Sequence, residues 1–501
     1  MVHPDIREFH TLSTHGNLIP VYREILADMD TPVSALLKLG GKPSFLLESV
    51  VGGEKWARYS FIGSSPSKVI RGWRRGLSML IEICEEGKDP VSFETDTPLQ
   101  ALRDELSAYK PVEITKVPRF YGGMVGYISY DMVRFFEKLP ESGKVDIGMP
   151  DIFFMVTDTM LIFDNLRQKV RIVSNAHLNG KNPDEAYSES VEKIDSLTER
   201  LRQPLKVERW TRNRPQSHRH IPSAFTSSYN SKDSFIEAVL RTKDYVMSGD
   251  VLQTVLSQRF ETTSEAHPFD IYRALRVINP SPYMYYIDIG DLKIVGSSPE
   301  ILVRLEGGKI VLRPIAGTRQ RGDTEPEDKT LEQELKGDSK EIAEHIMLVD
   351  LGRNDVGRVA KTGSVEVTEL MTVERYSHVM HLVSNVEGDL REGLDAFDVL
   401  EACFPAGTVT GAPKVRSMEI IEELEPTRRG PYAGSLGYFS YSGNMDMCIT
   451  IRTLFIKDGK VFVQSGAGIV ADSDPEKEYA ETVNKALAMM NAVEMAEKGL
   501  E

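Results

Sequence analysis

The sequence predicts an α+β fold, and three observations indicate this class. Short apolar runs alternate with Gly and Ser turns between residues 44 and 83, which is typical of antiparallel strands. Beyond residue 231, long helical patterns at 338–352, 394–403 and 475–497 are mixed with strands. The mixture follows no regular βαβ order, and no internal repeat is apparent.

In the first half of the chain, the expected strands are followed by one clear helix. The apolar runs cover residues 45–47, 59–62, 68–73 and 77–83. Thr97 is expected to cap the helix, and Pro98 suits its first turn. The apolar stripe of this helix consists of Leu99, Leu102 and Leu106.

The segment 203–230 is predicted to be a linker. It contains three prolines among Arg, His, Ser and Asn residues, with almost no periodic apolar pattern. We therefore expect an amino-terminal domain over 1–202 and a carboxy-terminal domain over 231–501. The length agrees with this division, because a single core rarely serves 501 residues.

In the second part, a helix is expected to end near Gly249. A strand at 251–260 and a helix at 270–279 follow it, and three further strands come next. The last strands are predicted at 435–441, 447–456 and 460–465.

The composition limits the compartment and the partners. With 75 acidic and 60 basic side chains, the formal charge of −15 argues against a nucleic-acid partner. The three cysteines, Cys84, Cys403 and Cys448, lack the spacing of a disulfide framework or a zinc site. A leader-like start and a run of about 18 apolar residues are both missing. We expect a cytoplasmic protein with no membrane partner.

Two Glu-x-x-Glu pairs are the candidate metal ligands. Glu341 and Glu344 form one pair and Glu478 and Glu481 the other, each near the start of a predicted helix. Residues three apart share a helix face, so two such helices would create an oxygen-lined site of the kind Mg²⁺ prefers. Such a metal would let an acidic chain bind a carboxylate-bearing substrate. Either pair alone is equally explained as a solvated helix face.

Glycines and one arginine indicate an anion site. Gly466, Ala467 and Gly468 end a strand before the second Glu pair, and Gly317 precedes Thr318 after another strand. Glycine lets backbone amides approach an anion closely. Arg452 lies in an apolar predicted strand and needs a partner such as a carboxylate. Ordinary turns and a structural Arg–Glu pair are the alternatives.

Residues 279–488 resemble the chorismate-utilising enzymes. The motifs are NPSPYMYY from Asn279, GSSPE from Gly296, RPIAGTRQRG from Arg313, AEHIMLVDLGRND from Ala343, YSHVMHLVS from Tyr376, FPAGTVTGAPK from Phe404 and QSGAGIVADSDPEKEYAET from Gln464. The whole chain is similar to the large subunits of anthranilate synthase. This resemblance implies antiparallel β-sheets in a sandwich flanked by helices, with intertwined regulatory and catalytic parts.

The resemblance also implies the residues that bind metal and substrate. Glu344 and Glu481 would be the Mg²⁺ ligands, and Glu341 and Glu478 would complete the carboxylate shell. The implied chorismate contacts are Gly317, Thr318, Tyr432, Arg452 and the backbone amides of Gly466, Ala467 and Gly468.

The implied reaction is the first step of tryptophan biosynthesis. Ammonia aminates chorismate to aminodeoxyisochorismate, and elimination of pyruvate then gives anthranilate. Glu300 corresponds to the acid that protonates the departing C4 hydroxyl. His381, with Thr408 beside it, is the candidate that assists the elimination. A lone His between apolar residues is more often a buried core residue.

Two positions distinguish this reaction from those of related enzymes. Gln253 stands where relatives that add water carry Lys, because ammonia needs no deprotonation. Ala316 stands where aminodeoxychorismate synthases carry a nucleophilic Lys. The alternatives are an aminodeoxychorismate synthase component I or a related synthase that stops before pyruvate loss, and a non-catalytic amino-acid sensor of the same fold.

The amino-terminal half resembles the regulatory portion of the same family, through FLLES from Phe45 and ARYSFIG from Ala57. The indole ring of a tryptophan ligand needs apolar walls, and the ammonium group of the ligand needs a carboxylate or carbonyl. We expect L-tryptophan to inhibit by shifting the domains between two arrangements. The expected contacts are Leu47, Glu48, Ser49, Pro282, Tyr283 and Met284.

The three cysteines lack the Gly-flanked turn that a glutaminase nucleophile needs. A separate glutamine amidotransferase subunit is therefore expected to supply ammonia, which makes the protein part of a hetero-oligomer.

Overall fold

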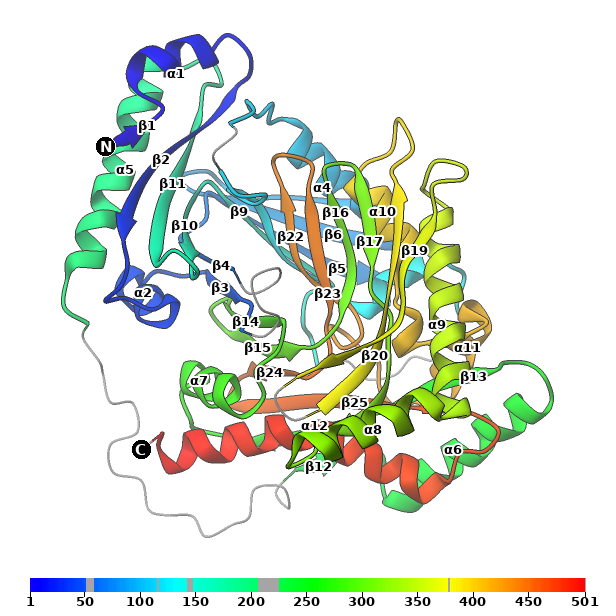
Figure 1. The fold of residues 1–501 in the computed structure, drawn as a ribbon. Helices are drawn as coiled ribbons and strands as arrows, with labels where there is room; N and C mark the ends of the chain where they lie inside the picture. The colour runs from blue at the N-terminus through cyan, green and yellow to red at the C-terminus, as the bar shows by residue number, and fades with distance from the viewer. Residues whose placement is uncertain (51–57, 115–116, 142–146, 206–224, 377–378, 501) are drawn as a thin grey trace.

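The computed structural model describes residues 1–501 except 51–57, 115–116, 142–146, 206–224, 377–378 and 501. Its strands form two large antiparallel sheets, a first sheet of 13 strands and a second sheet of 12, with helices around them (Figure 1). The predicted α+β class is confirmed. Most of the predicted linker, 203–230, lies outside the described residues, and the division into 1–202 and 231–501 stays a proposal.

The amino-terminal half contributes elements to both sheets. They are β1 (Val2–His3), α1 (Ile6–Leu12), β2 (Leu18–Leu26), α2 (Pro32–Leu39), β3 (Ser44–Glu48), β4 (Tyr59–Ser64), β5 (Lys68–Arg75), β6 (Ser78–Glu85), β7 (Val91–Thr95), α4 (Pro98–Ser107), β8 (Gly123–Ile128), η1 (Tyr130–Phe135), β9 (Ile152–Thr157), β10 (Thr159–Asp164), β11 (Lys169–His177) and α5 (Pro183–Arg202).

The carboxy-terminal half extends both sheets. Its elements are β12 (Thr226–Ser227), α6 (Lys232–Met247), β13 (Gln253–Thr263), α7 (Pro268–Ile278), β14 (Tyr283–Asp288), β15 (Leu292–Ser298), β16 (Ile301–Glu306), β17 (Lys309–Leu312), β18 (Ile315–Gln320), α8 (Glu325–Gly337), α9 (Ser339–Gly357), β19 (Glu366–Arg375), β20 (Val379–Asp389), α10 (Ala396–Cys403), η3 (Gly407–Val409), β21 (Gly411–Ala412), α11 (Lys414–Leu424), β22 (Ser435–Ser440), β23 (Met445–Ile449), β24 (Thr453–Lys457), β25 (Lys460–Ile469) and α12 (Pro475–Lys498).

Each sheet contains strands from both halves. The order in the first sheet is β1-β2-β11-β10-β4-β3-β14-β15-β24-β25-β13-β12, with β21 added to β13. The order in the second sheet is β18-β20-β17-β16-β23-β22-β8-β9-β5-β6-β7, with β19 added to β20. The halves are therefore intertwined, as the resemblance implied.

The two largest hydrophobic cores among the described residues hold the layers together. Because successive strand residues face opposite sides of a sheet, Tyr285 and Tyr286 of β14 enter different cores. The core around Tyr285 contains side chains of both sheets, such as Phe61 and Tyr438. The core around Tyr286 lies between the first sheet and its helices, among them α5 and α12, the long helices at the left and along the bottom of Figure 1.

The helix ends follow the local sequence, with one exception. The Asp474 side chain accepts bonds from the backbone amides of Glu476 and Lys477, and Pro475 occupies the first turn of α12. Thr97 makes no side-chain bond to the start of α4. Thr97 thus occupies the expected cap position, directly before Pro98, but does not cap the helix with its side chain.

The chain passes directly from one sheet to the other at four crossovers: β4 to β5, β9 to β10, β15 to β16, and β23 to β24. The last crossover interrupts the predicted strand 447–456 at residues 450–452. Arg452 there has a φ of 52°, in the left-handed region that few non-glycine residues adopt. The strand prediction was wrong at this point because the apolar pattern continues across the crossover.

The strand order reveals an internal repeat. It is symmetric about the β3–β14 pair in the first sheet and, apart from β18, about the β8–β22 pair in the second. The sequences of the two copies agree: YGGMVGYISY from Tyr121 matches YAGSLGYFSY from Tyr432, GSSPS from Gly63 matches GSSPE from Gly296, and PDEAYSESVEK from Pro183 matches PEKEYAETVNK from Pro475. The prediction of no repeat was wrong. The second copy carries β18, α8, α9 and β19 as additions, so the copies have no constant period.

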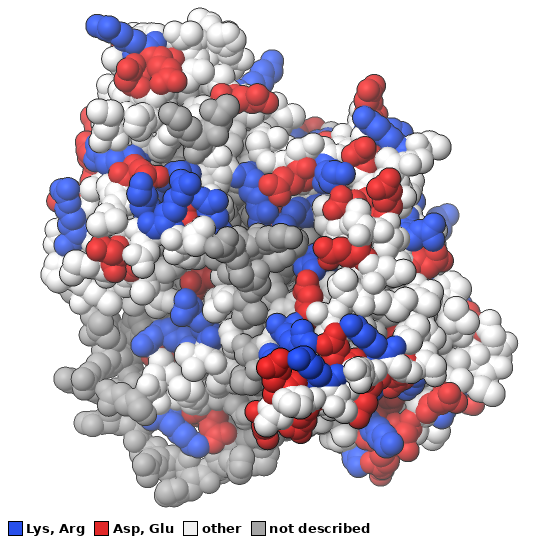
Figure 2. Space-filling view, viewed as in Figure 1, with Lys and Arg blue, Asp and Glu red and all other residues white. Residues whose placement is uncertain are grey.

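The surface adds two observations. On the face shown in Figure 2, acidic and basic side chains of the described residues are interspersed, so the net charge of −15 is not gathered there. None of the helices in the described part of the chain is long and apolar enough to cross a bilayer.

Candidate active site

A cavity of about 780 Å³ lies where the carboxy-terminal crossovers meet helices α9 and α12. Its volume is in the range of about 300–1,000 Å³ that is usual for small-molecule sites. It brings together Glu300, Gln253, Tyr432 and Arg452 with residues of β18, β25 and both helices. The predicted site residues found on its wall are Gln253, Glu300, Gly317, Thr318, Glu341, Glu344, Thr408, Tyr432, Arg452, Gly466, Gly468, Glu478 and Glu481.

Two neighbouring crossovers position the acid and the cation of the cavity. Glu300 follows β15, and Arg452 precedes β24. The Ile449 amide donates to the Glu300 carbonyl at 3.0 Å, and the Ser297 amide donates to the Arg452 carbonyl at 3.1 Å. Glu300 and Arg452 are therefore fixed relative to each other by backbone bonds.

Arg452 is available to bind an anion. Its guanidinium donates to the Lys485 carbonyl at 3.1 Å, and among the described residues no carboxylate forms an ion pair with it. Burial lowers the pKa of Arg452. A buried guanidinium with unused donors matches the two oxygens of a carboxylate ligand.

Glycine is required at two places on the wall. A Cβ at Gly468 would lie 2.3 Å from Gln253 Nε2, so any side chain there would displace Gln253. Gly317 has a φ of 64° and sits at an irregularity in the pairing of β18 with β20, a conformation that glycine adopts without strain. Larger residues at these two positions would therefore disturb the wall of the cavity.

Helices α9 and α12 carry the four predicted carboxylates to one wall. The pKa of Glu344 is raised by burial and by the charges of Glu341 and Glu481. The pKa of Glu478 is raised by burial and by Glu481. The Gln253 side chain donates to Glu344 at 3.2 Å. The carboxylates are therefore close enough to repel one another.

Mg²⁺ fits this donor set, because a hard cation with oxygen ligands would relieve the repulsion. The four side chains do not yet form a coordination shell. Glu341 Oε1 lies 3.3 Å from Arg319 Nη1, and Glu481 Oε1 lies 2.6 Å from Lys485 Nζ. In the part of the chain that the structure describes, no three acidic, His or Cys side chains are grouped closely enough to hold an ion. Binding would require Glu341 and Glu481 to turn away from these cations.

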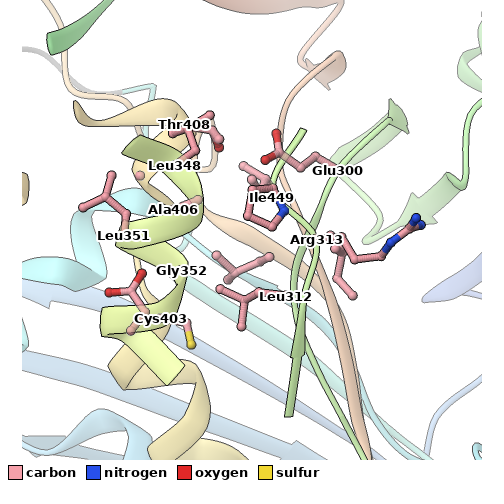
Figure 3. Close-up of a pocket in the computed structure, with 15 residues that line it drawn as sticks. Glu300, Leu312, Arg313, Leu348, Leu351, Gly352, Cys403, Ala406, Thr408 and Ile449 are labelled. Atoms are coloured by element: carbon pink, nitrogen blue, oxygen red, sulfur yellow. The ribbon is translucent and has the colours of Figure 1, made fainter. Parts of the chain in front are cut away.

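Glu300 has the properties of a general acid. Burial raises its pKa to about 8, against a smaller opposite effect of the Thr408 hydroxyl. The Glu300 carboxyl points toward Thr408 across a small cavity of about 40 Å³ behind the main one (Figure 3). Leu312, Leu348 and Ile449 supply much of its apolar wall (Figure 3). A carboxyl in these surroundings stays protonated at neutral pH.

Two predicted residues do not line the main cavity. The side chain of Ala467 packs in a separate hydrophobic cluster with Phe235 and Leu256. His381 Nδ1 lies 3.0 Å from the Gly317 carbonyl and 3.1 Å from the Thr318 hydroxyl. Because the carbonyl only accepts, Nδ1 carries the proton and Nε2 is left as the acceptor. Burial also lowers the pKa of His381, which favours this neutral form.

A second cavity of about 350 Å³, here called the central cavity, lies beside the β3–β14 pair. Its wall includes all six predicted tryptophan contacts, Leu47, Glu48, Ser49, Pro282, Tyr283 and Met284. Glu48 is already engaged, because Tyr272 donates to it at 2.5 Å and Arg276 Nε at 3.1 Å. That the central cavity binds tryptophan stays a prediction.

Sequence reasoning missed several charged residues of both cavities. Lys340, Lys477 and Lys485 line the main cavity. The spacing of four between Glu481 and Lys485 could have revealed the last of them. In the central cavity, the buried Asp446 lies 2.7 Å from Arg304. This pair joins two strands far apart in sequence and has no local signal.

Comparisons with known proteins agree with this geometry. The model of the chorismate binding enzyme family matches residues 57–491. The chain is 51% identical over 499 residues to anthranilate synthase component 1 of Aquifex aeolicus, and 48% identical over 500 residues to that of Acetivibrio thermocellus, with 99% of each chain covered in both cases. The crystal structure of anthranilate synthase component I from Streptococcus pneumoniae gives a TM-score of 0.73 at 36% identity, covering 93% of this chain and 99% of that chain.

Proposed function

This chain belongs to the chorismate-binding enzyme family, within its anthranilate synthase component 1 branch, and from that premise we propose that the 780 Å³ cavity is where chorismate is converted. One observation supports this most strongly. A buried acid, Glu300, and an arginine that forms no ion pair with a carboxylate of the described residues, Arg452, share one cavity with four carboxylates from α9 and α12. In an acidic chain, this arrangement is explained by binding of an anionic substrate.

In the first half-reaction, Arg452 binds a chorismate carboxylate, and Tyr432 with the amides of Gly466 and Gly468 completes the anion site. Ammonia forms a bond to C2 while the C4–O bond breaks. Glu300 gives its proton to the departing hydroxyl, which leaves as water. Gln253 lies beside Glu344 and orients the ammonia, whose lone pair needs no base.

In the second half-reaction, the C2 proton is removed, the bond from the ring to the enolpyruvyl oxygen breaks, and pyruvate leaves. The product is the aromatic ring of anthranilate. His381 assists through Nε2, with Thr408 nearby. Ala316, on the same wall, provides no nucleophile for a covalent intermediate.

Mg²⁺, held by Glu344 and Glu481 with support from Glu341 and Glu478, would supply the positive charge that draws a second chorismate carboxylate to this acidic wall. The protein residues do the rest: they hold the substrate, carry the protons and exclude water.

The name component 1 in the relatives implies a second component. We assign this role to a glutamine amidotransferase subunit, with the complex in the cytoplasm. The cysteines support this division: Cys403 and Cys448 are buried at 1% exposure, and Cys84 lies within β6. L-Tryptophan is assigned to the central cavity as an inhibitor.

The test is an assay of the purified chain with chorismate, Mg²⁺ and ammonium, followed by anthranilate fluorescence. We expect product with ammonium, none with glutamine, and loss of product with EDTA or L-tryptophan. Formation of an amino intermediate without anthranilate would support an enzyme that stops before pyruvate loss. No consumption of chorismate would reject the proposal.

A further inference from the structure

Tyr285, in β14, connects the central cavity with the crossover that carries Arg452. Its ring lines the central cavity and is 1% exposed. Its hydroxyl lies 2.6 Å from the Thr453 hydroxyl, and Thr453 directly follows Arg452. One side chain therefore touches both regions.

The direction of this hydrogen bond follows from the next one. The Thr453 hydroxyl donates to the Ile451 carbonyl at 2.8 Å. Because a hydroxyl has a single proton, Thr453 must accept from Tyr285. The bonds form a chain from Tyr285 to Thr453 to Ile451.

This chain closes a tight loop around Arg452. Thr453 bonds back to Ile451, so the residue between them is held at its left-handed φ of 52°. That conformation is unfavourable for a residue with a Cβ and persists only where its surroundings fix it. Ile451 also lines the main cavity. The orientation of Arg452 thus depends on Thr453, which Tyr285 holds.

The internal repeat provides a comparison within the same molecule. The ring of Phe45 packs over Gly63 as the ring of Tyr285 packs over Gly296, and both pairs stand opposite each other across neighbouring strands. By strand register, the amino-terminal counterpart of Arg452 is Thr159, which lies outside the left-handed region. The carboxy-terminal copy has the hydroxyl of Tyr285, and its crossover from β23 to β24 contains a strained residue. The amino-terminal copy has Phe45 without a hydroxyl, and its crossover from β9 to β10 has no such residue at the matching position.

We propose that Tyr285 is a positioning residue for Arg452 and the link through which an occupant of the central cavity lowers affinity for chorismate. This rests on the proposed function, because it takes an indole-bearing amino acid as the occupant. An indole that presses on the Tyr285 ring moves the hydroxyl away from Thr453 and releases Arg452. By linkage, chorismate weakens binding of the indole ligand by the same factor.

The test is Tyr285→Phe, which removes only the hydroxyl. We expect the KM for chorismate to rise about two- to tenfold, the effect of one lost hydrogen bond, with kcat within about twofold. L-Tryptophan should still bind, because the ring remains, but saturating tryptophan should raise KM by less than half the wild-type factor. Thr453→Val should behave the same way, and the double variant should be no worse than either single one.

Tyr286→Phe is the matched control. Tyr286 is the next residue of β14, is buried at 4% exposure and faces the other core. It should leave KM and inhibition unchanged. Wild-type values of KM and of the tryptophan effect in a folded Tyr285→Phe enzyme would overturn this inference alone. A wild-type chain that does not bind chorismate would overturn the proposed function as well.

Discussion

The two copies of the internal repeat share a backbone but differ in what fills the space between their sheets. In the carboxy-terminal copy, Arg452 faces an open cavity bordered by Gly466 and Gly468. In the amino-terminal copy, the matching positions are Thr159, Asn175 and His177. Arginine and two glycines have thus become a threonine and two larger side chains that occupy space.

These side chains close the amino-terminal copy. His177 lies 2.7 Å from Asp158, and Tyr441 donates to the same carboxylate at 2.6 Å. Asn175 donates to the carbonyls of Tyr121 and Asp158 at 2.8 and 2.9 Å. His177 and Tyr441 both contact the Asp158 carboxylate, so no ligand is needed to engage it. Ser67 stands where the other copy has Glu300.

The difference shows that chemistry on this fold depends on a few substitutions rather than on the sheets themselves. Gly466 and Gly468 replace larger side chains, Arg452 provides the anion site because no carboxylate of the described residues forms an ion pair with it, and burial raises the pKa of the acid Glu300. The same crossovers without these residues are structural.

The largest effect should come from giving the active copy the residue of the closed one. In Gly468→His, the new Cβ would lie 2.3 Å from Gln253 Nε2, so the ring must fill the cavity or displace Gln253. We expect kcat/KM to fall about 100-fold or more, measured by anthranilate fluorescence. The reverse change, His177→Gly, should leave kcat/KM within about threefold. Equal losses in both variants would show that the copies are not functionally distinct.

Arg452→Lys should have the next largest effect. Lysine keeps the charge but cannot bind a carboxylate with two parallel bonds. We expect KM for chorismate to rise about tenfold or more, because bonds to charged groups each contribute about 1.5–3 kcal/mol. Lys485→Met, on the same wall, is expected to raise KM less. An unchanged KM in Arg452→Lys would remove Arg452 from the anion site.

The pH profile tests the role of Glu300. Its pKa is raised to about 8, so the acid is protonated below that pH and is lost as the pH rises through it. With rates expressed against free ammonia, kcat should fall above about pH 8. Glu300→Gln should be nearly inactive and lack this limb. A flat profile up to pH 10, about two units beyond that pKa, would contradict the assignment.

The smallest effect on activity is expected for His177→Ala, which should change only the stability of the protein. His177→Ala removes the imidazole that lies 2.7 Å from the buried Asp158 carboxylate. We expect the free energy of unfolding to fall by about 1–3 kcal/mol, measured by urea denaturation. KM for chorismate should be unchanged, because this copy binds no substrate. A raised KM would show that the closed copy also supports the site.

Part of the site could be predicted from local sequence. The spacing of three in both Glu pairs placed each pair on one helix face, and a polar residue in an apolar strand identified Arg452. Both signals arise within a few residues. The raised pKa of Glu300 could not be foreseen, because it depends on burial at a crossover between sheets.

The remaining features depend on contacts between distant segments. Tyr285 reads as an ordinary strand residue until its bond to Thr453 is seen. Asp446 and Arg304 meet only after the second sheet forms. The repeat was not recognised because additions such as α8 and α9 lengthen the second copy, so matching motifs do not recur at a constant spacing. Sequence patterns therefore predicted the elements and the family, whereas the contacts made at the crossovers between the sheets became apparent only in the structure.

Isothermal titration of the chain with chorismate, in the presence of Mg²⁺ and without ammonia, tests most directly whether only one copy of the repeat is a binding site. The structure predicts one chorismate per chain, with binding abolished in Gly468→His and retained in His177→Gly. Two equivalents per chain, or full binding by Gly468→His, would contradict it.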